Sequence, residues 1–287
     1  MVKVVMGGAR SGRPKRRRVV VAACLAVLCA VPGLVSCDVR QRHVVLDGGT
    51  FTPLTPEDEA RGTRLARTAA DLLRTTDSVR LSVTTAGSGS GGAGGQKVSL
   101  LMDRDGNCTG TFDVGPMRRG ELVVTGKQAY VRLSDAALDE IRASAESRGA
   151  EARARVAQRT EFARGKFLKA PLKDSGGLAP SSSCDLDALL QNLDGDPGAT
   201  KALPETTRYG RHVTPLVEKG REGGTTMYVA ASGRPYILGV TGRENGRSME
   251  MRLSDYGSPV DVHAPGAEET IVIDPNASGS GGSLFDL

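Results

Sequence analysis

The sequence predicts an α+β domain built on a curved, mostly antiparallel sheet, with helices packed on its concave face. Apolar and polar residues alternate in two blocks of short segments, residues 78–133 and 209–253, which indicates two runs of antiparallel strands. Segments with apolar residues at helical spacing precede the first block and separate the two. Strand runs with helices between them are typical of the α+β class. Because the sheet has one apolar face to bury, helices wrapped over it can leave an apolar cavity.

The first helix is expected at residues 56–76. Thr55 is a good N-cap, and Pro56 suits the first helical position because its missing N–H is not needed there. Three acidic residues follow at 57–59, where the positive end of the helix dipole stabilises them. The apolar stripe of this helix consists of Leu65, Ala69, Leu72 and Leu73.

Strands are expected wherever the alternation has a period of two. The first block predicts strands at residues 79–83, 97–102, 110–114, 121–125 and 128–133. The second block predicts strands at residues 209–218, 225–231, 236–242 and 248–253. Residues 254–261 are expected to close the sheet.

Helices are expected between the two blocks. Residues 134–159 are rich in Ala, Glu and Arg with a thin apolar stripe, so the second half is predicted to be a solvated helix or a mobile loop. Residues 166–168 read as a short strand. Residues 185–193 carry four leucines on one side and predict a short helix.

The N-terminal segment has the features of an export signal. A basic run, Arg16–Arg18, precedes an apolar run from Val19 to Val35, and Leu34-Val35-Ser36-Cys37 resembles the lipobox of bacterial lipoproteins. In that family the thiol at the position of Cys37 receives a diacylglyceryl group and the peptide is cut before it. Two alternatives are an ordinary secreted protein and an uncleaved transmembrane anchor, but the apolar run is short for a span of about 20 residues.

These features predict four parts of the chain. Residues 1–36 are the cleaved signal peptide, and residues 37–54 form a flexible tether with little periodicity. Residues 55–275 form one domain. Residues 276–287 are a Gly/Ser-rich tail that is expected to be disordered.

Net charge argues against a nucleic-acid partner once the signal is removed. The whole chain has 38 Lys+Arg, 33 Asp+Glu and a net charge of +5. Seven of these basic residues and none of the acids lie in residues 1–36, so 31 bases and 33 acids remain, a net charge of −2. No basic patch interleaved with aromatic residues is left to suggest nucleic-acid binding.

Two cysteines are expected to form a disulfide. Of five cysteines, two lie in the signal and Cys37 is the expected lipidation site, which leaves Cys108 and Cys184. An exported chain most simply pairs them, and the alternative is two buried free thiols.

No metal site, cofactor or catalytic residue is expected. The three histidines, His43, His212 and His263, are isolated and show no spacing typical of metal ligands. The chain lacks the Gly-x-Ser-x-Gly elbow of α/β-hydrolases. We therefore expect a protein that is not an enzyme.

Several segments resemble the LppX/LprG-type actinobacterial lipoproteins. Besides the lipobox, the similar segments are Glu121–Val124, Ala129–Val131, Gly165–Leu168, Thr226–Val229, Gly233–Tyr236 and Leu253–Val260. The resemblance covers roughly residues 60–275. It implies a half-barrel like that of LolA and LolB, in which family members carry acylated lipids or glycolipids under the sheet. The glycine-rich run at residues 87–95 and the segment at residues 143–160 depart from the family pattern.

Two functions follow as hypotheses. The first is a lipoprotein anchored through Cys37 on the extracytoplasmic face of the cell membrane, which binds or carries a lipid or lipidated glycan in the envelope. The second is a non-catalytic envelope interaction or regulatory lipoprotein with a filled core and a protein partner. The sequence favours the first through the family resemblance, and no residue identifies the ligand.

Replacing the lipidated cysteine tests the anchor. Cys37→Ala should release the protein or stall its export without unfolding residues 56–275, because each buried acyl CH₂ contributes about 0.8 kcal/mol to membrane attachment. Detergent phase separation measures the attachment. A variant that still partitions into the detergent phase after signal removal would contradict the prediction.

Overall fold

The structure is a computed structural model. The expected signal peptide, tether and tail, and most of the glycine-rich run, lie outside the described residues. The description covers residues 55–86, 95–177, 179–193, 200–218, 224–244 and 247–273. No helix in this part is long and apolar enough to cross a membrane.

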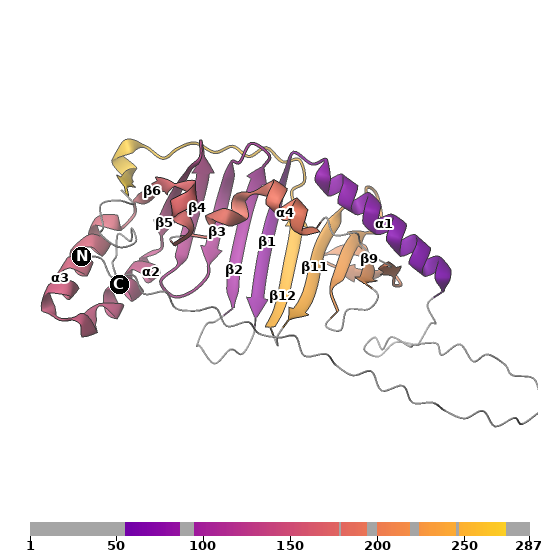
Figure 1. The fold of residues 1–287 in the computed structure, drawn as a ribbon, viewed down its shortest axis with the longest axis horizontal. Helices are drawn as coiled ribbons and strands as arrows, with labels where there is room; N and C mark the ends of the chain where they lie inside the picture. Colours follow the sequence, from indigo (N-terminus) through magenta and orange to yellow (C-terminus); the bar gives the residue numbers. More distant parts are fainter. Residues whose placement is uncertain are drawn as a thin grey trace, which may run out of the picture. The chain divides into compact units, whose positions relative to one another are not determined.

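The strands form one open, mostly antiparallel sheet, so the predicted α+β class is confirmed (Figure 1). Their order is β13-β6-β5-β4-β3-β2-β1-β12-β11-β10-β9-β7, and β8 also pairs with β9. The parallel pair is β13 with β6. The bounds are β1 (Ser78–Ala86), β2 (Gln96–Asp103), β3 (Cys108–Asp113), β4 (Arg119–Thr125), β5 (Gln128–Leu133), β6 (Phe167–Pro171), β7 (Thr200–Ala202), β8 (Thr206–Arg208), β9 (Arg211–Glu218), β10 (Thr226–Ala230), β11 (Ile237–Glu244), β12 (Arg247–Ser254) and β13 (Thr270–Val272).

The α-helices of the described part precede the sheet or lie between its two halves in the chain, whereas the last 3₁₀ helix lies between β12 and β13. The α-helices are α1 (Pro56–Arg74), α2 (Asp135–Ser144), α3 (Ala150–Ala163) and α4 (Leu186–Leu193). The 3₁₀ helices are η1 (Glu146–Arg148), η2 (Leu172–Gly177), η3 (Ser181–Cys184) and η4 (Ala267–Glu269).

Helix α1 begins where the sequence predicts. Thr55 is the N-cap, and its side chain and that of Asp58 form a capping box, which satisfies two backbone N–H groups at the helix start. The buried side of the helix includes Ala66, Ala69 and Leu73. At Gly62 the helix approaches the backbone of β7 so closely that a Cβ atom would collide with the Thr200 carbonyl oxygen.

The helix predicted at residues 134–159 is broken. Helix α2 ends at Ser144, η1 follows, and Gly149, with φ = +93°, separates η1 from α3. Helix α2 buries Ala137, Leu138 and Ile141. Helix α3 forms a regular helix with few buried side chains, so the expected solvated helix is confirmed for the second half.

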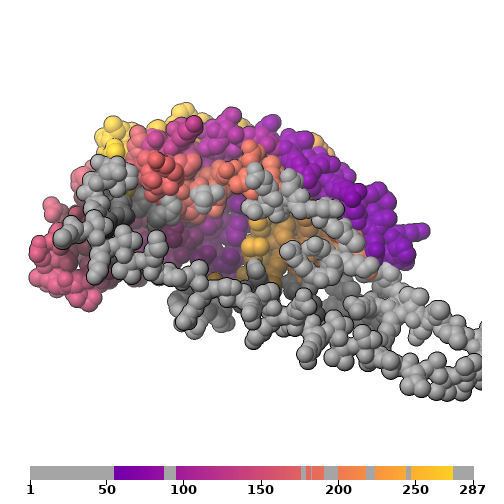
Figure 2. Space-filling model, viewed as in Figure 1, coloured from indigo at the N-terminus to yellow at the C-terminus, as the bar shows by residue number. Residues whose placement is uncertain are grey.

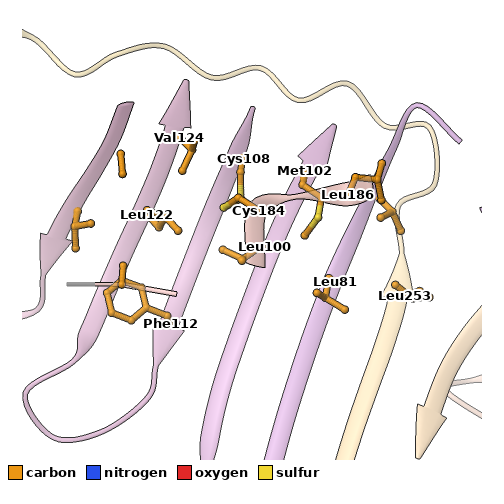
Figure 3. Packing of buried hydrophobic residues seen from close by; sticks show 14 of the residues in the cluster. Leu81, Leu100, Met102, Cys108, Phe112, Leu122, Val124, Cys184, Leu186 and Leu253 are labelled. Carbon is orange, nitrogen blue, oxygen red and sulfur yellow. A yellow bond between two sulfur atoms is a disulfide. The ribbon is translucent and has the colours of Figure 1, made fainter. Parts of the chain in front are cut away.

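The two faces of the sheet differ in composition. Cross-strand partners share a face, and the rows that contain Leu81, Leu100 and Leu122 define the face that we call the inner face. Residues of this face form the main core with α1, α2, α3 and α4. Figure 3 shows the part of this core in which Leu186 of α4 lies against strand residues such as Met102 and Leu100. The opposite face, the outer face, carries residues such as Arg132, Glu250 and Arg252.

One strand prediction in the last third needs a shorter range and another is wrong. The strand predicted at residues 209–218 is confirmed as β9, but it begins at Arg211, because Tyr209 (φ +55°) and Gly210 (φ +71°) make a tight turn between β8 and β9. Residues 254–261 do not close the sheet. Asp255 (φ +52°) and Gly257 (φ +71°) turn the chain out of β12, and β13 instead adds in parallel beside β6.

Glycines on the inner face allow the sheet to coil. A Cβ atom at Gly110 would collide with the Ser99 carbonyl oxygen of β2, and one at Gly120 would collide with the Arg132 carbonyl oxygen of β5. Only glycine fits at such close backbone approaches. The coiling of β2–β5 therefore depends on these two positions.

Gly110→Ala should lower the free energy of unfolding by about 1–3 kcal/mol, because the added methyl group forces β2 and β3 apart. Gly242→Ala is the matched control, since a Cβ atom there would meet only the Thr225 hydroxyl oxygen at 3.6 Å. Urea denaturation measures both changes. Equal destabilisation by the two substitutions would contradict this account of the curvature.

Candidate functional site

An apolar strip lies at one end of the inner face, where the described helices end. It comprises the half-buried residues Val83, Val98, Met227 and Met251 and the exposed Met249, and we call it the inner-face strip. Val83 pairs with both Val98 and Met251. Val240, which pairs with Met227 and Met251, joins the two ends of the strip. The five side chains therefore come from four strands and form one continuous surface.

Exposure rises along each strand toward the strip. In β1, Val79 and Leu81 are buried, whereas Val83 is only half-buried. In β12, Leu253 is 2% exposed and Met249 is 40% exposed. Figure 2 shows β1 and β12 set back behind α4 and α1 on this side of the molecule. The inner face thus passes from a closed core into an apolar surface that described residues cover only in part.

The closed end of the inner face is covered by η3 and α4. The disulfide between Cys108 of β3 and Cys184 of η3 fastens this segment to the sheet, which confirms the expected pair (Figure 3). Leu186 and Leu190 of α4 pack into the core beside it. Arg104 at the end of β2 pairs with Asp187 of α4 at 3.1 Å. These contacts fix where the cover stops and the inner-face strip begins.

The inner-face strip offers only apolar groups. Its side chains are methyls and thioethers, which carry no charge and form at most weak hydrogen bonds. Three buried side-chain atoms of the described part make no hydrogen bond of normal geometry: Arg119 Nε, Arg208 Nε and Tyr209 Oη, although Arg119 Nε forms an ion pair with Asp113 at 3.0 Å. None belongs to the strip, and by strand register all three side chains lie on the outer face. The strip can therefore bind an apolar chain but has no group that would move a proton or attack a substrate.

The other residues considered at the sequence level do not belong to the inner-face strip or lie outside the described part. Cys37 and His43 lie outside it. His212 is exposed on β9, and His263 is an exposed residue whose Nδ1 lies 3.4 Å from an Asp261 oxygen. No group of three His, Cys, Asp or Glu side chains that could hold a metal ion occurs among the described residues.

Sequence reasoning missed the inner-face strip. The alternation in residues 248–253 places Met249 and Met251 on one face, and Met227 comes from another strand. The sequence pattern does not indicate which end of the inner face the helices leave uncovered. That depends on where α1 and α4 pack, which the period of the strands does not encode.

No protein-family model matches the chain, and no curated protein does. Among solved structures, the chain is similar to LprF from Mycobacterium bovis, with 13% identity and a TM-score of 0.49, over 74% of this chain and 98% of LprF. It is similar to the lipoprotein LppX from Mycobacterium tuberculosis, with 14% identity and a TM-score of 0.38, over 71% of this chain and 99% of LppX.

A LolA superfamily protein from Nitrosomonas europaea is also similar, with 10% identity and a TM-score of 0.26, over 68% of this chain and 92% of that protein. The lipoproteins that the sequence resembles are thus found again among the similar structures. At these identities the likeness concerns the fold alone.

Removing the disulfide tests how α4 is held. Replacing both Cys108 and Cys184 by Ala should lower the free energy of unfolding by about 2–5 kcal/mol, because the bond closes a loop with a sequence separation of 76 residues. Urea denaturation with and without reductant measures the effect. The wild type should lose stability in reductant and the double variant should not; a reductant-insensitive wild type would contradict the prediction.

Proposed function

We propose that this chain is a lipoprotein, anchored through Cys37 on the extracytoplasmic face of the cell membrane, that binds the acyl part of a lipid or lipidated glycan on the inner-face strip. The observation that carries the proposal is a continuous apolar surface on an open sheet, without charged side chains, at the end that the described helices leave partly uncovered. The proposed role is non-catalytic.

The side chains of the strip suit an acyl chain. Three of the five are methionines, whose unbranched thioether side chains adapt to irregular apolar partners. Burial of apolar surface contributes about 0.8 kcal/mol per CH₂ group. Burial of about ten methylenes would therefore contribute about 8 kcal/mol, which offsets the cost of association, and each further buried methylene would add net affinity.

Anchoring and binding would work together in this arrangement. A lipid anchor at Cys37 would keep the domain at the membrane surface, where its ligand is concentrated. The expected tether, residues 37–54, would allow the sheet to approach the bilayer and move away from it. The same geometry suits extraction of a lipid or its presentation to another envelope protein.

A charge placed in the inner-face strip tests the proposal. Wild-type protein from its native host should copurify with acyl lipid, as measured by native mass spectrometry and by extraction with organic solvent. Met249→Glu should lower lipid occupancy at least tenfold, because a carboxylate loses hydration beside an acyl chain. Stability should change little, since Met249 is 40% exposed.

Met117→Glu is the matched control. Met117 is also a methionine, is 38% exposed and lies in the turn between β3 and β4, so the same charge is introduced away from the strip. This variant should retain its lipid. Lipid-free wild-type protein from the native host would contradict the proposal and favour an interaction module with a filled core and a protein partner.

A further inference from the structure

Tyrosine and arginine side chains gather on the outer face of β8–β12, the face opposite the inner-face strip. Tyr228 pairs with Gly239, which pairs with Arg252, so these three residues form one row across β10, β11 and β12. Arg208 and Arg211 face each other beside the β8–β9 turn. We call Arg208, Tyr209, Arg211, Tyr228 and Arg252 the outer-face patch. This patch plays no part in the proposed binding of an acyl chain.

Tyr209 occupies a backbone conformation that a tyrosine rarely adopts. Its φ is +55°, in the left-handed region that favours glycine and asparagine. Its ring lies over Gly239, where a Cβ atom would be only 2.6 Å from the Tyr209 hydroxyl oxygen. The observed position of the Tyr209 ring therefore requires an unfavourable φ at residue 209 and a residue without a side chain at position 239 of β11. Residues held in such conformations cluster at functional sites.

Two guanidinium groups lie on the tyrosine rings. The Arg208 guanidinium carbon is 5.1 Å from the centre of the Tyr209 ring and 4.4 Å from that of Tyr228. The Arg252 guanidinium carbon is 4.7 Å from the centre of the Tyr209 ring. One carboxylate is present, since Arg208 Nη2 lies 3.3 Å from a Glu250 oxygen. Among the ion pairs of the described residues, this is the one that involves an arginine of the patch.

Two buried hydrogen-bond donors in the patch make no hydrogen bond of normal geometry. The Arg208 guanidinium donates through Nη1 to the Tyr228 hydroxyl and through Nη2 to Glu250, but its Nε is buried without a partner. The buried Tyr209 hydroxyl lies beside Arg208 and the Glu250 carboxylate, but it makes no hydrogen bond of normal geometry with either group. Burial raises the pKa of Tyr209, so this hydroxyl stays protonated as a donor at neutral pH. Buried donors without acceptors are rare in folded proteins.

We propose that the outer-face patch binds a phosphate group, which accepts hydrogen bonds from the Tyr209 hydroxyl and Arg208 Nε while Arg252 and Arg211 neutralise its charge. Guanidinium forks match phosphate oxygens in geometry and charge. Arg252 is an exposed side chain over the Tyr209 ring, and it turns toward the phosphate to open access to the two donors. The phosphate belongs either to a lipid headgroup or to a free phosphate ion.

Removing one hydroxyl group tests this site. In full-length protein in detergent, isothermal titration with inorganic phosphate and with glycerophosphoglycerol, a chain-free phosphodiester headgroup, measures binding. Tyr209→Phe should weaken binding about tenfold, as expected for a lost hydrogen bond to a charged group. Its melting temperature should change little, because the hydroxyl makes no hydrogen bond of normal geometry within the protein. Arg252→Gln should weaken binding about three- to tenfold.

Two controls separate this effect from general changes of charge or packing. Tyr130→Phe changes a tyrosine on the outer face of β5, and Arg153→Gln removes an exposed arginine of α3; both should bind as wild type. Tighter binding of glycerophosphoglycerol than of phosphate identifies a headgroup as the source, and the reverse identifies free phosphate. Absence of binding to both probes, unchanged binding by Tyr209→Phe, or a lower melting temperature of that variant would overturn the proposal.

Discussion

The structure depends on the need to cover one apolar face of a large open sheet. Alternate residues of β1–β5 and of β9–β12 point to the inner face, and many of them are aliphatic. An open sheet cannot bury this face by closing on itself, so helices must do it. Helices α1, α2 and α4 contribute buried side chains to the same core. The extent of this cover decides which part of the face stays available to a ligand.

The cover over the centre of the sheet is fastened by a few specific contacts. The disulfide joins η3 to β3, and Arg104 links three elements: its Nε donates to the Thr76 carbonyl oxygen after α1 at 2.8 Å, while its Nη1 pairs with Asp187 of α4. Among the described residues, no disulfide or ion pair joins a helix to the end of the sheet where β1 and β12 carry half-buried and exposed apolar residues. The difference in fastening explains why the core and the inner-face strip share one face yet differ in exposure.

The two faces of the sheet present different chemistry in the same strands. In β12, Met249 and Met251 belong to the inner-face strip, while Glu250 and Arg252 point to the outer face. Because successive side chains of β12 point to opposite faces of the sheet, this strand contributes residues to both the inner-face strip and the outer-face patch. An apolar chain and a phosphate group would bind on opposite sides of the sheet, with no shared side chain, so each can be altered without removing the other.

The sequence by itself determined the local structure. Thr55 and Pro56 fixed the start of α1, the alternation of residues fixed most strands, and the export context predicted the bond between Cys108 and Cys184. Tertiary structure alone decided that β1 lies beside β12, that β13 joins β6, and that Tyr209 turns back over Gly239. Residue periodicity and helix-capping residues indicate interactions between residues close together in the chain. The strand order, the turn at Tyr209 and the uncovered end of the inner face depend instead on packing between segments that are far apart in the sequence.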